Sequence, residues 1–180
     1  MYAIYEGDHA VTFKRWLPET IEGVTTYAWR SKHTWTDWHL IPSKRPQLPP
    51  PSLKTNYVDI PGAHGHLDLS QVLTGEPRFE NRTDSMDFIL MNKSINQDGP
   101  QYEVNWYERY SEIMNWLHGQ NARMILDDDP TWTWVARFTV SGFESQNNYS
   151  TIQISYDAYP YKVKFTSPSA QTSTTSEVSL

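Results

Sequence analysis

Two segments in the last third of the chain alternate apolar and polar side chains, and this pattern constrains the fold more than any other feature. In the first segment, one face consists of Trp132, Trp134, Ala136, Phe138 and Val140. In the second, one face consists of Ile152, Ile154, Tyr156 and Ala158. Successive side chains of a strand point to opposite faces, so each segment predicts a strand with one buried face. Short links between such strands predict an antiparallel meander, which Tyr161, Val163 and Phe165 continue.

The rest of the chain is also mainly β in pattern. Strands are expected at residues 11–13, 24–30, 56–60, 67–70, 86–90 and 123–126. Turns or loops are expected at residues 18–23, 61–62, 92–100, 127–130 and 144–150. Four prolines between Pro46 and Pro51 predict an extended linker, because proline fixes φ and lacks a backbone N–H.

One helix is expected at about residues 105–118. Trp106, Tyr110, Ile113 and Leu117 recur at intervals of four, three and four residues and form one apolar stripe. Asn105 is a suitable N-cap and Gly119 a suitable left-handed residue after the helix. The stripe predicts packing of the helix on a sheet, so the fold class is an antiparallel β-sandwich with one helix.

The composition of the chain excludes several classes of function. The chain has 180 residues, enough for one ordinary domain, and no cysteine, which excludes disulfides, thiol catalysis and zinc–thiolate sites. The net charge of -6 argues against general nucleic-acid binding, whose affinity comes largely from cationic side chains on phosphates. The amino terminus lacks the pattern of a signal peptide and no segment has the length of a membrane span, so we expect no membrane insertion.

Candidates for chemistry are few. His64, His66 and Asp68 could form a metal site, but the glycine and proline around them favour a surface turn. The carboxylates of Asp127–Asp129 favour a solvated hairpin tip, since the spacing of a calcium loop is missing.

The remaining polar and aromatic candidates favour structural roles. His39 and His118 have no evident nucleophile partner, and His118 falls where an imidazolium would favour the helix dipole. Trp132 and Trp134 could stack on a sugar, although their position on an apolar face favours the core. We therefore expect no enzyme, no cofactor and no metal.

Several phrases occur in the order found in one protein family. They are Thr34–Pro42, Lys54–Gly62, Leu67–Ser70, Leu73–Gly75, Asn81–Arg82, Tyr110–Gly119 and Tyr159–Lys162. Together they resemble the amino-terminal domain of the distal tail proteins (Dit) of long-tailed phages that infect Gram-positive bacteria. The motif residues that the resemblance assigns to structure or assembly are Trp35, Asp37, Trp38, Pro42, Asn56, Tyr57, Asp59, Pro61, Gly62 and Gly75.

The resemblance implies a structural role in the virion. Such a domain forms a hexameric ring that joins the tail tube to the baseplate hub, on which host-attachment proteins dock and through which DNA passes without specific binding. The protein would be made in the cytoplasm of the host bacterium and reside in the phage tail tip. The expected organisation is an amino-terminal arm at residues 1–23, a ring domain at 24–165 and a Ser/Thr-rich tail at 166–180.

Three other functions stay open at the level of sequence, one of which is a metal-dependent enzyme that would use His64, His66 and Asp68. A carbohydrate-binding module for host recognition would use exposed aromatic rings, and a tail-tube subunit would share the assembly but occupy another station of the tail. Many members of the family carry a second, carbohydrate-binding-like domain after the ring domain, which is not expected in a chain that ends soon after Phe165. Because passing DNA is a polyanion, a channel would be lined by acidic or neutral side chains.

Overall fold

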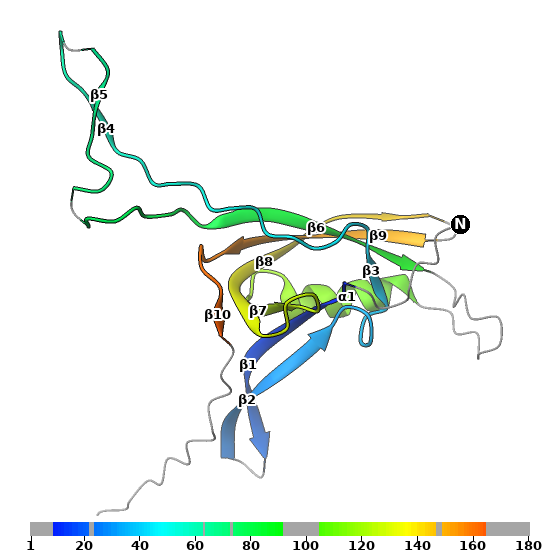
Figure 1. Ribbon diagram of the computed structural model, residues 1–180. Coiled ribbons are helices and arrows are strands. Elements are labelled where there is room, and N and C mark those ends of the chain that lie inside the picture. The colour runs from blue at the N-terminus through cyan, green and yellow to red at the C-terminus, as the bar shows by residue number, and fades with distance from the viewer. Residues whose placement is uncertain are drawn as a thin grey trace, which may run out of the picture.

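A computed structural model describes residues 9–21, 24–62, 64–72, 74–91, 105–146 and 149–164. Within them the protein is mainly β, with one helix, and its arrangement is that of a β-sandwich-like fold (Figure 1). The strands are β1 Val11–Ile21, β2 Val24–His33, β3 Leu40–Pro42, β4 Tyr57–Asp59, β5 His66–Asp68, β6 Arg82–Met91, β7 Asn121–Leu126, β8 Trp132–Ser145, β9 Tyr149–Ala158 and β10 Val163–Lys164. The predicted mainly β, antiparallel fold class is confirmed.

The main sheet has the order β2-β1-β7-β8-β9-β6-β3, and β10 pairs separately with the start of β8. All of these pairs are antiparallel. The two alternating segments of the sequence are β8 and β9, which lie side by side at the centre, with Phe138 opposite Tyr156. A β-bulge interrupts their register between Ser141 and Phe143, where Gly142 adopts a φ of 57°.

The helix α1, Trp106–Leu117, packs on the sheet as its apolar stripe predicts, with Ile113 and Leu117 fully buried. Asn105 is the N-cap and His118 the C-cap, followed by Gly119 at a φ of 71°. This confirms the predicted helix and both of its end signals. In the described residues no helix combines the length and the apolar character that a membrane span requires.

Phe13 joins the amino-terminal strand to the core. Its ring lies 5.1 Å from that of Phe138 in an edge-on contact and 5.9 Å from that of Trp38. The turn predicted at residues 18–23 is wrong for residues 18–21, because β1 continues through Pro18 to Ile21, and residues 22 and 23 lie outside the described part of the chain. Among the described strands, the residues of β1 beyond Lys14 pair with β2 alone, so this part of β1 has an open edge, where proline is tolerated.

The expected boundary between the amino-terminal arm and the ring domain, at residue 23, falls between the two paired strands of the β1–β2 hairpin. Residues 11–14 belong to the main sheet, whereas the paired ends of β1 and β2 project from the body, at the bottom of Figure 1. A projection at the amino-terminal end exists, but it consists of two strands, and residues 1–8 lie outside the described part of the chain.

Two further strand boundaries differ from expectation. The loop predicted at 144–150 is shorter, because β8 runs to Ser145 and β9 begins at Tyr149. Tyr161 and Val163 do not extend the buried face of β9, since they are 60% and 42% exposed and β10 instead pairs with β8. Proline at position 160 ends the alternation, because it lies in a bend after β9. The loop expected at 92–100, Phe165 and the tail at 166–180 lie outside the described residues.

Candidate functional site

A long arm projects from the body between β3 and β6. We define the long arm as residues 45–81; Figure 1 shows it at the upper left, ending in the β4–β5 hairpin. Its two legs are joined by backbone hydrogen bonds, from the N–H of Lys54 to Arg78 at 2.8 Å and from the N–H of Glu80 to Ser52 at 2.8 Å. The proline-rich leg is extended, as predicted, and forms one side of this projection.

The long arm carries apolar side chains that no described part of the chain covers. Its exposed large apolar residues, 41% to 67% accessible, are Leu53, Tyr57, Val58, Ile60, Leu67 and Val72. The two strands at its tip have three residues each, and all six residues are exposed. A two-stranded hairpin is at best marginally stable in water on its own, so this arrangement favours a partner that covers the tip.

The base of the long arm is fixed to the body. Arg82 donates to the carbonyl oxygens of Pro49 at 2.7 Å and Pro160 at 2.8 Å. The Tyr156 hydroxyl donates to the carbonyl oxygen of Gln47 at 3.2 Å. Burial, followed by the nearby Asp84 carboxylate, raises the pKa of Tyr156 to about 12, so the hydroxyl keeps its proton at neutral pH.

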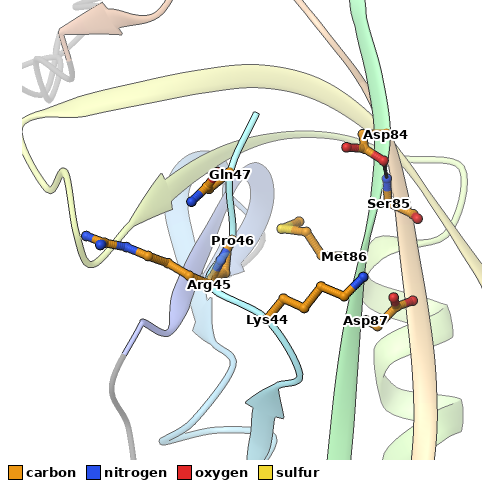
Figure 2. Close-up of a pocket in the computed structure, with 8 residues that line it drawn as sticks. All are labelled: Lys44, Arg45, Pro46, Gln47, Asp84, Ser85, Met86 and Asp87. Atoms are coloured by element: carbon orange, nitrogen blue, oxygen red, sulfur yellow. Dashed lines mark hydrogen bonds between the residues drawn. The ribbon is translucent and has the colours of Figure 1, made fainter. Parts of the chain in front are cut away.

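A cavity of about 270 Å³ lies beside this base (Figure 2). It is lined by Lys44, Arg45, Pro46, Gln47, Asp84, Ser85, Met86 and Asp87. Figure 2 shows the Lys44 side chain extending toward Asp87, while the Arg45 guanidinium points away from the cavity. Cationic and anionic side chains thus line the cavity together.

Four of the ten motif residues lie on the body. Trp38 is fully buried, whereas Trp35 is half-buried with its ring edge-on to that of His39 at 6.1 Å. Pro42 ends β3 opposite Phe88 of β6. The Asp37 carboxylate accepts from the backbone N–H of His33 at 2.7 Å, so these residues shape the turn that leads into the long arm.

The other six motif residues lie on the long arm. Asn56 and Tyr57 begin its outer hairpin, Asp59 pairs with His66, and Pro61 forms the turn at the tip. Gly62 and Gly75 adopt φ values of 83° and 69°, which side chains with a Cβ rarely adopt. These positions set the shape of the projection and make no catalytic constellation.

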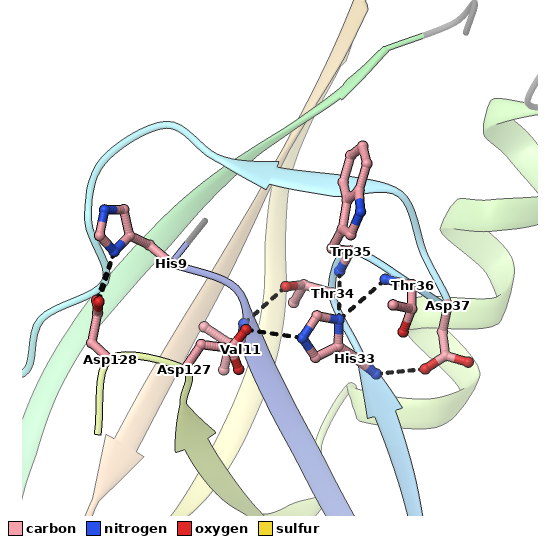
Figure 3. A network of polar contacts seen from close by, with 9 residues as sticks. All are labelled: His9, Val11, His33, Thr34, Trp35, Thr36, Asp37, Asp127 and Asp128. Atoms are coloured by element: carbon pink, nitrogen blue, oxygen red, sulfur yellow. Dashed lines mark hydrogen bonds and ion pairs between the residues drawn. The ribbon is translucent and has the colours of Figure 1, made fainter. Parts of the chain in front are cut away.

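A second polar network holds the turn at 33–37 (Figure 3). His33 Nδ1 accepts from the backbone N–H groups of Trp35 at 3.2 Å and Thr36 at 3.1 Å. The ring proton therefore belongs on Nε2, which lies 3.1 Å from the Asp127 carboxylate. Figure 3 shows the side chain linking β2 to the turn after β7.

The acidic turn at 127–129 connects several segments of the body through its carboxylates. The Asp128 carboxylate lies 2.8 Å from His9 Nδ1 and 3.0 Å from Arg45 Nε, which precedes the proline-rich leg. Burial opposes ionisation of Asp128, but the hydrogen bonds and charges of Arg45 and His9 prevail and lower its pKa. The predicted turn is confirmed, and its carboxylates are engaged by neighbouring segments.

The metal candidate does not assemble. His66 Nδ1 hydrogen-bonds Asp59, while Asp68 accepts from the backbone N–H of Ser70 at 2.9 Å. The pKa of Asp68 is lowered by its hydrogen bonds from Ser70. Within the described ranges, no group of three or more histidine, aspartate or glutamate side chains is placed to hold a metal ion.

The two other histidines have structural surroundings. Burial, with the nearby Arg109 charge, lowers the pKa of His39, which sits at a φ of 56°. The Nδ1 atom of His118 lies 3.2 Å from the backbone N of Val140 and accepts its hydrogen bond. This contact links the end of α1 to β8.

Trp132 and Trp134 do not form an open platform. Trp134 is buried and the Arg82 guanidinium lies 4.7 Å from its ring centroid. Lys162 lies 5.2 Å from the ring of Trp132 and also pairs with Asp129 at 2.6 Å. The core interpretation of Trp134 is confirmed, and a sugar site at this pair is disfavoured.

Comparison with known proteins bears on the fold. No protein-family model matches the chain, and no curated protein does. Among solved structures, the chain is similar to that of SPP1 Dit, described as a paradigm of the hub adsorption apparatus in phages infecting Gram-positive bacteria, with a TM-score of 0.52 and 15% identity. The match covers 86% of this chain and 52% of that chain, so this chain spans about half the length of SPP1 Dit. At this identity the likeness concerns the fold, and it agrees with the fold that the sequence resemblance implied.

Proposed function

We propose that the chain is a structural, non-enzymatic subunit of a phage tail, and that copies of it assemble into a closed ring near the tail tip. The ring is a hexamer that joins the tail tube to the hub, lets DNA pass without specific binding and offers a surface for host-attachment proteins. The likeness in fold to SPP1 Dit and the ordered sequence motifs support this proposal.

The exposed long arm is the observation that carries it. Its tip presents Val58, Ile60 and Leu67 to solvent, far from the buried core. Covering these side chains with a neighbouring copy removes apolar surface from water, which stabilises association by about 25 cal/mol per Å². We propose that the arm docks on a different surface of the next copy, which makes the contact heterologous, and heterologous contacts generate rings when the rotation closes.

Particle mass measured by light scattering tests the assembly. We expect the chain to form a particle several times the mass of one copy, and Ile60→Asp together with Leu67→Asp to reduce that particle to monomers. Both residues are exposed and outside the core, so the variant retains the fold. Tyr107→Ser, at a 71% exposed position on the helix, is the matched control and leaves the particle intact.

Electron microscopy of the same particles tests the station along the tail. Single closed rings support a distal tail ring, whereas stacks that extend into tubes support a tail-tube subunit. A protein that stays monomeric at every concentration and does not enter tails contradicts both.

A further inference from the structure

One face of the main sheet combines exposed aromatic rings with cationic side chains. We define the aromatic face as the outward side chains of β1, β2 and β7, on the side opposite Val11 and Phe13. Cross-strand pairing aligns them, since Trp16 lies opposite Trp29 and Lys14 lies opposite Arg123. The face consists of Thr12, Lys14, Trp16, Pro18, Thr20, Thr25, Tyr27, Trp29, Ser31, His33, Asn121, Arg123 and Ile125.

The rings form a continuous aromatic surface. The centroids of Trp16 and Trp29 lie 5.1 Å apart, and those of Trp16 and Tyr27 lie 6.5 Å apart with their planes only 12° from parallel. Trp16 is 47% exposed and Tyr27 57% exposed, although both belong to regular strands. Large rings left open on a sheet offer flat apolar area to a ligand at low cost in conformational entropy.

A groove of about 210 Å³ adjoins these rings. It is lined by Lys14, Arg15, Trp16, Trp29, Asn121, Ala122, Arg123 and Val135. The volume is below the roughly 300–1,000 Å³ of pockets that enclose drug-sized ligands, so the groove suits a single ring of a longer molecule. Aromatic walls with a few polar groups are the usual composition of a ligand site.

The charged side chains of the aromatic face indicate which kind of ligand it would bind. By strand alternation the cationic side chains Lys14 and Arg123 lie on the aromatic face, and the Asp127 carboxylate lies at its edge, 3.1 Å from His33 Nε2. The Arg123 guanidinium lies 4.8 Å from the ring centroid of Trp29, which places a cation directly beside the aromatic surface. A local positive charge on a chain of net charge -6 favours an anionic group, and a guanidinium binds carboxylate or phosphate-like oxygens well.

The polar side of the groove adds a group that binds hydroxyls. The Asn121 side-chain oxygen accepts from Arg137 Nε at 3.3 Å, which orients the amide at the groove. A long polyanion such as single-stranded DNA needs a cationic track over many phosphates, and the rest of this acidic chain opposes one. A pyranose that bears one anionic group complements all three features of the site. Its apolar ring face matches the aromatic rings, its hydroxyls match the Asn121 amide, and its negative charge matches the cationic side chains.

We propose that the aromatic face binds an acidic oligosaccharide, with a sugar ring stacked on Trp16 and Tyr27 and its anionic group paired with Arg123 and Lys14. This site is independent of the ring assembly and of Trp132 and Trp134. It gives the chain a binding activity that the structural role does not require.

Isothermal titration calorimetry of the full chain tests the site. The probes are tetragalacturonic acid and a heparin-derived tetrasaccharide, with neutral cellotetraose as control. We expect both acidic probes to bind at least about tenfold more tightly than cellotetraose, Trp16→Ala to weaken them about tenfold, and Arg123→Gln to abolish the preference for acidic over neutral sugar. Tyr107→Ala, which removes an exposed ring elsewhere, leaves binding unchanged.

Several outcomes overturn the proposal. They are no binding of either acidic probe by the wild type, equal affinity for cellotetraose, tighter binding of a thymidine oligonucleotide, or equal loss in Tyr107→Ala. If Trp16→Ala abolishes particle formation and no sugar binds, the aromatic face is a contact between copies. If sugar binds while the wild type stays monomeric, the ring proposal fails and this one stands.

Discussion

Asp128 accepts contacts from His9 and Arg45, which approach it from the amino-terminal segment and from the start of the long arm. The folded pKa of Asp128 lies below the ordinary value of an aspartate, so its stabilising contribution is present above the unfolded pKa and disappears as pH falls through the folded one. We expect Asp128→Asn to lower the free energy of unfolding by about 0.5–1 kcal/mol at pH 7, because the pair is near the surface. The difference from wild type should shrink as pH falls below the ordinary range of an aspartate and vanish in strong acid, as measured by urea unfolding across pH.

High salt provides the control for this charge effect. The same difference at pH 7 should shrink when ionic strength is raised, because exposed ion pairs are screened. A difference that is equal at pH 3 and pH 7 would show that the asparagine perturbs packing and not charge.

Two tryptophans of one motif, Trp35 and Trp38, are expected to contribute different amounts to the free energy of unfolding. Trp38 is fully buried and packs against Phe13 and Trp116, both at 5.9 Å between ring centroids. Trp38→Ala should therefore cost about 3–5 kcal/mol by leaving a cavity. Trp35→Ala, at a half-buried site, should cost less than about 2 kcal/mol. Urea midpoints of the two variants compare them, and equal losses would contradict the burial of Trp38 as the cause.

At the scale of elements, the start of α1 depends on one side chain. The Asn105 side-chain oxygen accepts from the backbone N–H groups of Tyr107 at 3.2 Å and Glu108 at 3.5 Å. Asn105→Ala should destabilise the protein by about 1 kcal/mol, whereas Asn105→Asp should be close to neutral because aspartate caps equally well. Thermal unfolding followed by circular dichroism measures both, and a loss as large in Asn105→Asp would argue against capping.

The elements that could be predicted from the sequence are those with local signals. Apolar alternation identified β8 and β9, and the spacing of Trp106, Ile113 and Leu117 with its cap identified α1. The full length of β1 could not be predicted, because its polar and proline-containing outer half is held by cross-strand pairing with β2 and not by burial.

The candidate sites also divide into residues that have a local sequence signal and residues that do not. The motif residues around Asn56 and Gly62 were found, but their sequence gave no sign that they would stand on a projection away from the core. The aromatic face was missed because Trp16, Trp29 and Arg123 meet only through the pairing of three strands. Distances of this kind depend on register, which short sequence patterns do not determine.

At the scale of the whole molecule, the long arm should be dispensable for folding. The described residues between 55 and 77 contribute nothing to the buried core, and the backbones of Lys54 and Arg78 are already hydrogen-bonded at 2.8 Å. Replacing 55–77 with a short Gly-Ser turn should leave the thermal midpoint of a monomeric preparation within a few degrees of wild type, since a surface loop carries little closure entropy.

The same excision should abolish assembly. Thermal unfolding and light scattering on one sample separate the two effects. Loss of the fold on excision would mean that the arm is part of the cooperative unit, and an intact particle would mean that other surfaces hold the copies together.

The position of β1 has a consequence for the order of folding. β1 pairs on one side with β2, its neighbour in sequence, and on the other with β7, which is distant in sequence and whose Leu126 lies opposite Val11. The β1–β2 hairpin can form within about 1–10 μs, but Val11 and Phe13 find their core only when β7 and β8 arrive. Topologies dominated by such distant pairings fold in about milliseconds to seconds. A nascent chain therefore carries these apolar side chains uncovered through most of its synthesis, the period in which a folding chain is most prone to aggregate.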